Sequence, residues 1–312
     1  MPLLRRLLSS VGVLLFASFL SFILIKLAPG DLAQSIAQLR TGAVGSPKLL
    51  AQIRLEYGLN DPFIVQYGRW LIDALQGNLG RSIQTNIPIA QDVSARAGMT
   101  FALAGGALLF GAVTGIGLAL AGALRPGGTL DRILRYVGLF AVSIPGFALA
   151  LILILLFALK LRWLPVTGTG TLSGWILPWI ALGLASAGTI ARVLRSSLAD
   201  AMNQTFVTTA LSRGYTMRQV VFREAFPSVL TGLFAVLGVQ FGQLFISTVV
   251  IEAIFGITGL GQYFFHAAQF RDLPVVQSSL FLFALVFVGQ SLIVDFLQRL
   301  VDPRVRRGSS TA

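Results

Sequence analysis

The sequence predicts an all-α membrane protein with six transmembrane helices and with both termini in the cytoplasm. Of its 312 residues, 55% are hydrophobic and only 12% are charged, whereas a soluble domain carries roughly 25% charged residues. The charges cluster around six long uncharged runs, and a helix needs about 20 such residues to cross a ~30 Å hydrocarbon core. The runs are 7–25, 97–124, 136–159, 163–191, 225–251 and 273–294.

The positions of the arginines predict the orientation of the chain. The short segments expected to face the cytoplasm hold Arg5, Arg6, Arg125, Arg132, Arg135, Arg192, Arg195, Arg213, Arg218, Arg223, Arg299, Arg304, Arg306 and Arg307. The two short external loops hold only Lys160, Arg162 and Arg271. Cytoplasmic loops of membrane proteins carry an excess of Lys and Arg. The net charge of +12 therefore reflects membrane topology, and we expect no nucleic-acid partner.

The chain divides into three parts. Residues 1–28 form the N-terminus and the first transmembrane helix, which ends before Pro29-Gly30-Asp31 because proline cannot continue a helix. This apolar run is longer than a signal-peptide core, so we expect it to be retained. Residues 29–98 form an external segment of short helices and turns, punctuated by glycine and proline. Residues 99–312 hold the other five helices, with an internal loop at 205–226.

Two residue types stand out within the apolar runs. The second run contains glycines that would allow close helix approach, although glycine is also frequent in membrane helices generally: Gly105, Gly106, Gly111, Gly115 and Gly117. Near the external ends of the third and fourth runs, three tryptophans fit an interfacial aromatic belt: Trp163, Trp175 and Trp179.

The internal loop 205–226 is the most informative segment. Its sequence predicts two short helices broken at Gly214. Thr216 and Gln219 match a capping box, which would start the second helix, and Pro227 suits the first turn of the helix that follows.

The second short helix of this loop has an apolar face formed by Met217, Val220 and Val221. An apolar face on a cytoplasmic loop requires a cover. The cover is either the helix bundle itself or the groove of a partner protein, and the residues alone leave both alternatives open.

Several motifs carry a family resemblance. Gly214, followed thirteen residues later by Pro227, resembles the coupling loop of bacterial ABC importer permeases. The external segment narrows the resemblance to the dipeptide/oligopeptide/nickel permease family, through Tyr57-Gly58-Leu59-Asn60-Asp61-Pro62, Gln66-Tyr67, Trp70 and Gly77-Asn78-Leu79-Gly80-Arg81-Ser82. Further matches are Pro29-Gly30-Asp31, Ile251-Glu252-Ala253-Ile254-Phe255, Gly259-Leu260-Gly261 and Asp302-Pro303-Arg304-Val305-Arg306. The resemblance covers nearly the whole chain.

The sequence departs from the family pattern at two places. Thr208-Thr209-Ala210 stands where other branches have Glu-Ala-Ala, and Thr258 occupies a position usually held by proline. The second departure bears on the shape of the loop after the fifth helix.

The resemblance implies two sets of functional residues. Contact with a cytoplasmic ATPase is expected at Thr209, Ala210, Arg213, Gly214, Met217, Arg218, Val221 and Pro227. An external mouth is expected at Glu252, Phe255, Gly259, Leu260 and Gly261. Glu252 either shapes substrate entry there or has a structural role, as a cap or as the partner of a nearby arginine.

The resemblance also implies a function and an assembly. It predicts a permease of the bacterial cytoplasmic membrane that pairs in the lipid bilayer with a second, homologous permease, two cytoplasmic ATPases and an external substrate-binding protein. The substrate would be a peptide or a nickel or metal chelate. The short stretch 161–178 between the third and fourth helices slightly favours nickel.

We expect no catalytic, cofactor or metal site in this chain. It contains no cysteine and only one histidine, His266, and no GxxxxGK[ST] motif for binding ATP. One rival interpretation is an ion-coupled secondary transporter, which needs ionisable residues within its spans, and the second, third and fifth runs contain none. The other is an intramembrane enzyme, which needs a polar catalytic pair within the spans, and none is evident.

Overall fold

In a computed structural model the chain is all-helical, apart from one isolated β-bridge between Arg81 and Pro88 in the described part. The structure describes residues 2–27, 31–43, 45–124, 143–167 and 170–301, with single positions at 128, 129, 132, 136 and 138. Residues 125–127 (which include Arg125), most of the start of the third run, Pro29-Gly30 and the motif at 302–306 lie outside the described residues. Two compact units are present, unit 1 (Met1–Gly98 and Tyr263–Val288) and unit 2 (Met99–Gln262 and Gly289–Ala312).

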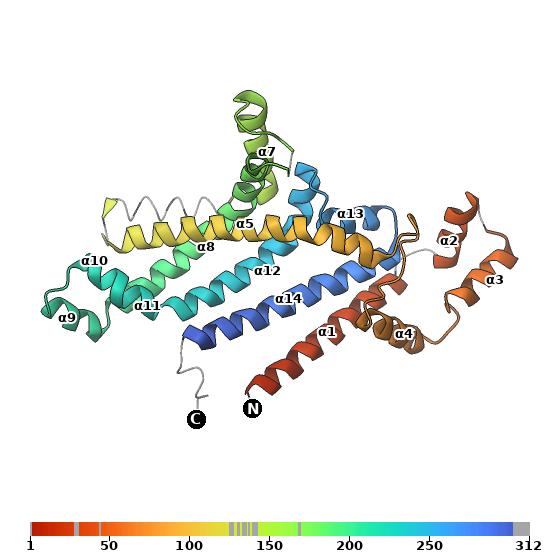
Figure 1. The fold of residues 1–312 in the computed structure, drawn as a ribbon, viewed down its shortest axis with the longest axis horizontal. Coiled ribbons are helices and arrows are strands. Elements are labelled where there is room, and N and C mark those ends of the chain that lie inside the picture. The colour runs from red at the N-terminus through yellow and green to blue at the C-terminus, as the bar shows by residue number, and fades with distance from the viewer. Residues whose placement is uncertain are drawn as a thin grey trace. The chain divides into compact units, whose positions relative to one another are not determined.

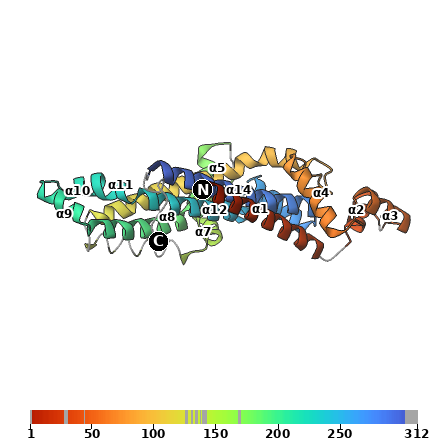
Figure 2. The ribbon, with the colours of Figure 1, turned by 90° about the horizontal axis from the view of Figure 1, so that it is seen from below.

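Unit 1 is built around the external segment. Its helices are α1 (Pro2–Leu27), α2 (Leu32–Thr41), α3 (Pro47–Glu56), α4 (Phe63–Leu75), the first turns of α5 (Ile89–Ala123), most of α13 (Leu260–Gln269) and the first half of α14 (Leu273–Val301). Asp31 caps α2 by accepting a hydrogen bond from the Ala33 amide, and Ser46 caps α3 by accepting one from the Leu49 amide. The two capped helices lie side by side (Figures 1 and 2).

Aromatic side chains join α1 to α4. The Phe22 ring meets the Phe63 ring edge-on with centroids 5.1 Å apart, and Trp70 meets Phe281 of α14 in the same manner at 5.5 Å. The Tyr67 hydroxyl lies 2.8 Å from the Ser18 hydroxyl. Such edge-to-face pairs add directional contacts to the burial of aromatic surface, so α4 is held firmly against the end of α1.

Unit 2 holds the main helical core. Its elements are the rest of α5, α7 (Gly146–Leu153), the π-helical segment η1 (Ile154–Lys160), α8 (Leu172–Met202), α9 (Thr205–Ser212), α10 (Met217–Val220), the π-helical segment η2 (Val221–Ala225), α11 (Phe226–Ser228) and α12 (Leu230–Phe255). Helix α8 packs against both α7 and α12. It is the most buried of the long helices, which makes it the centre of this unit.

Three of the five glycines in α5 lie against α8, as the close-approach interpretation predicts. A Cβ on Gly115 would be 2.7 Å from the Ala187 carbonyl oxygen, and one on Gly111 would be 3.0 Å from that of Gly183. Gly106 lies against the Trp179 ring, whereas no atom lies near the Cβ positions of Gly105 and Gly117. The small residues therefore let two backbones approach on one face only.

Four described helices are long and apolar enough to cross a membrane: Ile89–Ala123, Leu172–Met202, Leu230–Phe255 and Leu273–Gln298. They correspond to the second, fourth, fifth and sixth runs. Two shorter apolar helices, Leu8–Ile23 and Gly146–Lys160, lie at the first and third runs. The predicted all-helical membrane architecture is thus confirmed in this coarser form.

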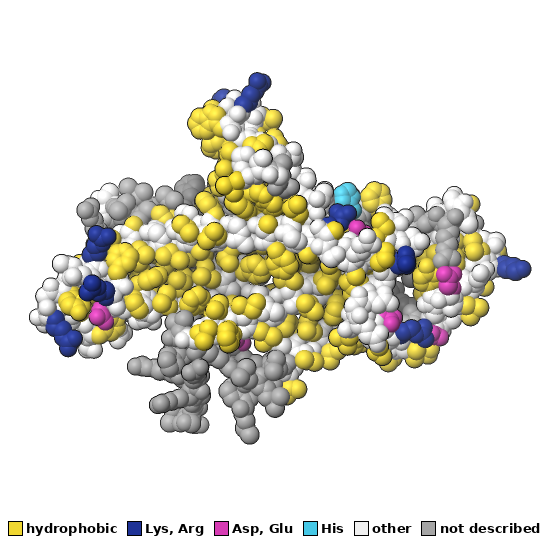
Figure 3. Space-filling view, in the orientation of Figure 1, with side chains coloured by type: hydrophobic (Ala, Val, Ile, Leu, Met, Phe, Trp, Pro, Cys, Tyr) yellow, Lys and Arg dark blue, Asp and Glu magenta, His cyan; other side chains and the backbone are white. Residues whose placement is uncertain are grey.

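Many large apolar side chains on these helices are exposed. Leu109 and Val113 of α5 are both 66% exposed, and Ile246 of α12 is 60% exposed. Figure 3 shows hydrophobic side chains along the long helices of unit 2 and basic ones at the end that carries α9 and α10. Exposed apolar surface of this extent is expected for helices that face lipid or a partner helix.

The helix boundaries differ from the uncharged runs because paired charges do not end a helix. Helix α5 begins at Ile89 rather than near Ala97, since Asp92 and Arg96 lie one turn apart on it with a 3.8 Å ion pair. Helix α8 likewise continues past its apolar run to Met202. Near the start of α12, Pro227 lies in the short α11 that precedes it.

The predicted aromatic belt is wrong for Trp175, which is buried, whereas Trp179 is half-buried beside it. Trp163 is 70% exposed, as a belt residue would be, but Trp175 is only 8% exposed. Its ring stacks on Trp179 with centroids 5.8 Å apart, and the Trp179 indole donates to the Ala102 carbonyl. These two side chains belong to the core between α5 and α8.

Candidate functional site

The loop between α8 and α12 folds locally as the sequence predicts. Gly214 follows α9 with a φ of 84°, in the left-handed region that favours glycine. Thr216 then caps α10, because the Gln219 amide donates to the Thr216 hydroxyl at 3.3 Å and the Thr216 amide donates to the Gln219 side-chain oxygen at 2.8 Å. The break at Gly214 and the capping box are both confirmed.

One side of this loop is covered by the protein itself. Val220 and Val221, two residues of the predicted apolar face, have no exposed surface. Val220 packs against Val207 and Ala210 of α9, and η2 packs against α8. For these valines the protein itself supplies the cover, Val220 through α9 of the same loop and η2 through α8 of the bundle. Met217 differs from them because it is 40% exposed.

Other residues of the loop are exposed and include both apolar and basic side chains. The apolar ones are Leu211, Met217 and Phe222, which are 42%, 40% and 43% exposed. Three exposed arginines accompany them, and we call these six residues the coupling surface: Arg213, Arg218 and Arg223 with Leu211, Met217 and Phe222. The Arg218 guanidinium lies 6.0 Å from the centre of the Phe222 ring. Apolar side chains among arginines are typical of a protein-binding surface.

The eight residues expected to contact an ATPase fall into two groups. The exposed ones are Thr209, Arg213, Gly214, Met217, Arg218 and Pro227. Ala210 and Val221 are buried, so they support the shape of the loop and do not reach its surface.

Sequence reasoning missed Leu211 and Phe222, which belong to the coupling surface. Phe222 lies in η2, where the chain follows a π-helical path. A π-helix has more residues per turn than an α-helix, so the 3.6-residue period does not predict which way Phe222 faces.

At the far end of α12, Glu252 is fully buried among hydrogen-bond donors. The Thr100 hydroxyl donates to one carboxylate oxygen at 2.6 Å, and the Gln262 amide donates to the other at 2.8 Å. Thr100 in turn accepts a hydrogen bond from the Leu260 amide at 2.7 Å. A buried carboxylate is stable only where donors surround it, and these donors join α5, the end of α12 and the start of α13.

Glycines make room for this carboxylate. A Cβ on Gly261 would lie 2.5 Å from the Val249 Cα and 3.0 Å from a Glu252 carboxylate oxygen. A Cβ on Gly259 would overlap the same carboxylate. Both positions therefore require the absence of a side chain.

The five residues expected at an external mouth do gather in one place, but the place is a closed junction. Phe255, Gly259, Leu260 and Gly261 are buried together with Glu252. Glu252 forms no ion pair with an arginine in the part of the chain that the structure describes. Sequence reasoning missed Thr100, its partner 152 positions away, because a threonine in an apolar helix carries no distinguishing signal.

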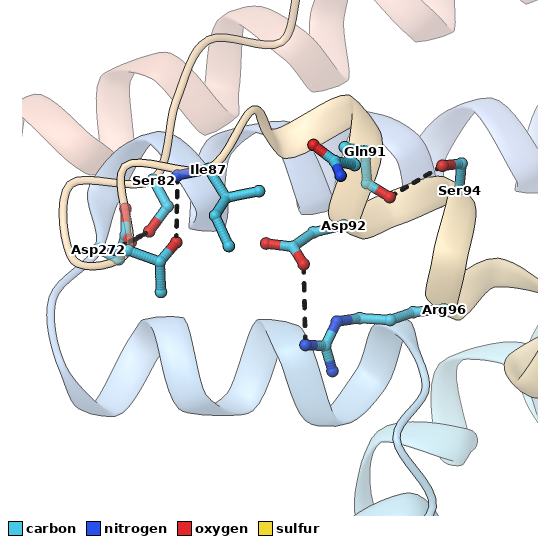
Figure 4. A network of polar contacts seen from close by, with 8 residues as sticks. Ser82, Ile87, Gln91, Asp92, Ser94, Arg96 and Asp272 are labelled. Atoms are coloured by element: carbon cyan, nitrogen blue, oxygen red, sulfur yellow. Dashed lines mark hydrogen bonds and ion pairs between the residues drawn. The ribbon is translucent and has the colours of Figure 1, made fainter.

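A second buried carboxylate holds the external segment of unit 1 together (Figure 4). Asp272 is 3% exposed and accepts hydrogen bonds from the Ser82 hydroxyl at 2.5 Å and from the Ile83 amide at 3.2 Å. The Ser278 hydroxyl of α14 donates to the Leu79 carbonyl. These bonds bind the turn 78–84, which contains the end of the external motif, to the start of α14.

Comparison with known families identifies the chain. Residues 111–307 match the family described as the inner membrane component of binding-protein-dependent transport systems, and residues 2–104 match its N-terminal segment. The chain belongs to this family. It is a non-catalytic permease component of the inner membrane, and its transport depends on a binding protein.

Curated relatives of this permease match over nearly their full length. A probable peptide ABC transporter permease of Sinorhizobium fredii is 32% identical, and a dipeptide transport system permease of Alkalihalophilus pseudofirmus is 33% identical. A glutathione transport system permease of Salmonella paratyphi A is 31% identical. In each case the alignment covers 97% of this chain and 98% of the relative.

The fold also matches a solved transporter. The inward-facing methionine ABC transporter MetNI aligns with a TM-score of 0.57 at 22% identity, over 67% of this permease and 96% of that chain. At this identity the likeness concerns the fold alone.

Proposed function

We propose that this permease imports short peptides, which it receives from an external binding protein and passes across the membrane at the expense of ATP hydrolysed by separate subunits. The relatives described above are named for peptides, a dipeptide and glutathione, which is itself a tripeptide. None of these three is named for nickel, so the slight preference of the stretch 161–178 for nickel finds no support in them.

The proposed assembly has six membrane spans with both termini in the cytoplasm. Its partners are a second, homologous permease, two ATPases and the binding protein. The four long apolar helices and the two shorter ones, each at one of the six uncharged runs, support the span count. The excess of arginine in the predicted internal segments supports the orientation.

The coupling surface is the observation that carries the proposed docking of separate ATPase subunits. It combines half-exposed Met217 and Phe222 with three arginines on a loop whose buried valines pack inside unit 2. A partner that covers the surface would bury its apolar side chains, while the arginines would set the orientation of docking.

The packing of this loop suggests how motion is transmitted. Val220 is buried against α9, and Ala225 of η2 packs with Leu194 and Leu198 of α8. A displacement of the loop therefore displaces α8 and the start of α12 with it. ATP bound by the separate ATPase subunits supplies the energy for this movement. Only a ligand that binds two conformations with different affinities can shift the equilibrium between them.

Cysteine labelling tests orientation and docking together, because the chain has no native cysteine. We expect an impermeant maleimide to label Gln52→Cys, but not Met217→Cys, in intact cells. In inside-out vesicles, Met217→Cys should react only after the ATPase subunits have been stripped away. Labelling of Met217→Cys from outside would overturn the orientation, and equal labelling with and without the ATPases would overturn the docking.

A further inference from the structure

Unit 1 contains a cavity of about 570 Å³ between the external segment and the start of α14. This volume lies within the range of about 300–1,000 Å³ that is usual for small-molecule sites. Trp70 and Asp73 reach it from the same face of α4, three residues apart, and Arg81 and Gln277 reach it from the turn after α4 and from α14. Half of its lining comes from the external motif quoted above, including Tyr57, Trp70 and Arg81.

Gln277 is a buried polar residue in the wall of this cavity. Its side chain is 94% buried, at 6% exposure, and it lines the cavity. Its amide nitrogen has no hydrogen-bond partner among the described residues. This nitrogen is itself enclosed by the protein, so Gln277 shapes the wall and the binding groups of the cavity are the charged side chains beside it.

The charges around the cavity divide into paired and available ones. Arg54 is paired with Asp31 at 2.6 Å, and Arg69 is paired with Asp61 at 2.9 Å. Arg81 donates one hydrogen bond to the Asn86 carbonyl, but no carboxylate of the described residues pairs with it. Asp73 likewise has no ion pair within the described part of the chain. One cation and one anion therefore remain available to a ligand.

The remaining wall offers apolar contact. Trp70 stands among the rings of Tyr67, Phe22 and Phe281, which fix its orientation. A rigid aromatic surface beside a few placed polar groups is the usual composition of a site for a small amphipathic molecule.

We propose that this cavity binds the zwitterionic backbone of a short peptide. Arg81 receives the terminal carboxylate, Asp73 receives the terminal ammonium group, and Trp70 contacts a side chain. The cavity is then a peptide-binding site in the external segment of the permease itself. The inference rests on the proposed import of peptides, and it adds the requirement for free termini.

Protection of a cysteine from labelling tests the site without any need for transport. Asn60→Cys places a thiol on the cavity wall, and Gln52→Cys places an exposed one on α3 outside the lining. The probe is alanyl-phenylalanine, added to the purified permease–ATPase complex without binding protein. It should slow maleimide labelling of Asn60→Cys but not of Gln52→Cys. The same peptide with acetylated and amidated termini should protect at least about tenfold less well, because charge-assisted bonds are lost.

Charge variants made in the Asn60→Cys chain sharpen the test. Asp73→Asn and Arg81→Gln should each raise the half-protecting peptide concentration about tenfold or more. Lys48→Gln, an exposed residue outside the cavity, should leave it unchanged. The inference is overturned if the peptide gives no protection, if the blocked peptide protects equally, or if both charge variants retain the wild-type value. Peptide uptake by the intact importer would still support the proposed function in each of those cases.

Discussion

The loop that leads into α12 and the loop that leaves it both depend on glycine, yet their surroundings are opposite. Gly214, in the first loop, has a positive φ and no atom within 4 Å of its Cβ position. Gly259 and Gly261, in the second, are pressed against Glu252 and the backbone of Val249. The first loop needs a backbone shape on an open surface, and the second needs space inside a closed junction. This contrast suggests that one loop is built to be contacted and the other to be immobile.

The largest effect should come from filling the closed junction. Gly261→Ala brings a methyl group within 2.5 Å of the Val249 Cα, and backbone atoms cannot move aside cheaply. We expect a loss of about 1–3 kcal/mol or more in stability, measured as a fall in the melting temperature of the solubilised complex. The matched control is Gly105→Ala, in open space on a helix, which should stabilise by up to about 1 kcal/mol. Equal melting temperatures for the two variants would contradict the closed junction.

The next effect concerns the buried carboxylate in that junction. Thr100→Val removes the hydroxyl that donates to Glu252 at 2.6 Å and should cost about 1–3 kcal/mol. Glu252→Gln should cost a similar amount, and the double variant should cost less than the sum, because the same interaction is lost twice. A double-mutant cycle on unfolding measures this coupling. Strict additivity would show that the two side chains do not act as a pair.

In the open loop, the expected change in stability is no larger than in the junction, but the functional effect is specific. Gly214→Val forces a branched residue into a left-handed backbone at a cost of about 1–3 kcal/mol, without a steric clash. Gly214→Asn tolerates that backbone and should retain substrate-stimulated ATPase activity, whereas the valine variant should lose most of it. If asparagine and valine behave alike in reconstituted vesicles, the positive φ is not what the loop requires.

The smallest effect is expected at the exposed ion pair of the external segment. The hydrogen bond from Arg54 holds the pKa of Asp31 below its usual value. Because the pKa is lower in the folded chain, this contribution is present above the unfolded-chain pKa of about 3.9. It is lost as the pH falls through the lower folded value.

Both side chains of this pair are partly exposed, so we expect the ion pair to contribute less than about 1 kcal/mol to the free energy of unfolding. Amide hydrogen exchange in α2 and α3, followed from pH 6 to pH 3, measures it. Protection should decline toward acid in the wild type and should decline less in Arg54→Gln. Protection that increases as the pH falls would contradict this prediction.

The sequence predicted the helical membrane architecture and the local form of loop 205–226, because apolar runs, Gly214 and the Thr216–Gln219 box are local signals. It did not predict where helices end, since the pairing of Asp92 with Arg96 lets α5 begin eight residues before the uncharged run. The sequence also did not predict contacts between segments that are distant along the chain. Thr100 binds Glu252 and Asp272 binds Ser82, and only the folded chain brings these pairs together.

The side of the loop that each residue faces was predictable only in part. Met217 and Val220 are both apolar and lie on the same short helix, yet one is half-exposed and the other buried. The difference arises from packing against α9, which the residue types do not encode. Phe222 escaped prediction because its π-helical segment breaks the helical period.

The ratio of peptide imported to ATP hydrolysed, in vesicles that contain the whole importer, tests the central claim most directly. Phe222→Glu replaces an exposed apolar side chain of the coupling surface with a carboxylate. Leu55→Asp makes a comparable change at an exposed site on α3, far along the chain from the loop. We expect Phe222→Glu to lower the ratio at least about tenfold with normal insertion of the permease, and Leu55→Asp to leave it unchanged. A wild-type ratio in Phe222→Glu would show that this surface does not couple ATP hydrolysis to transport.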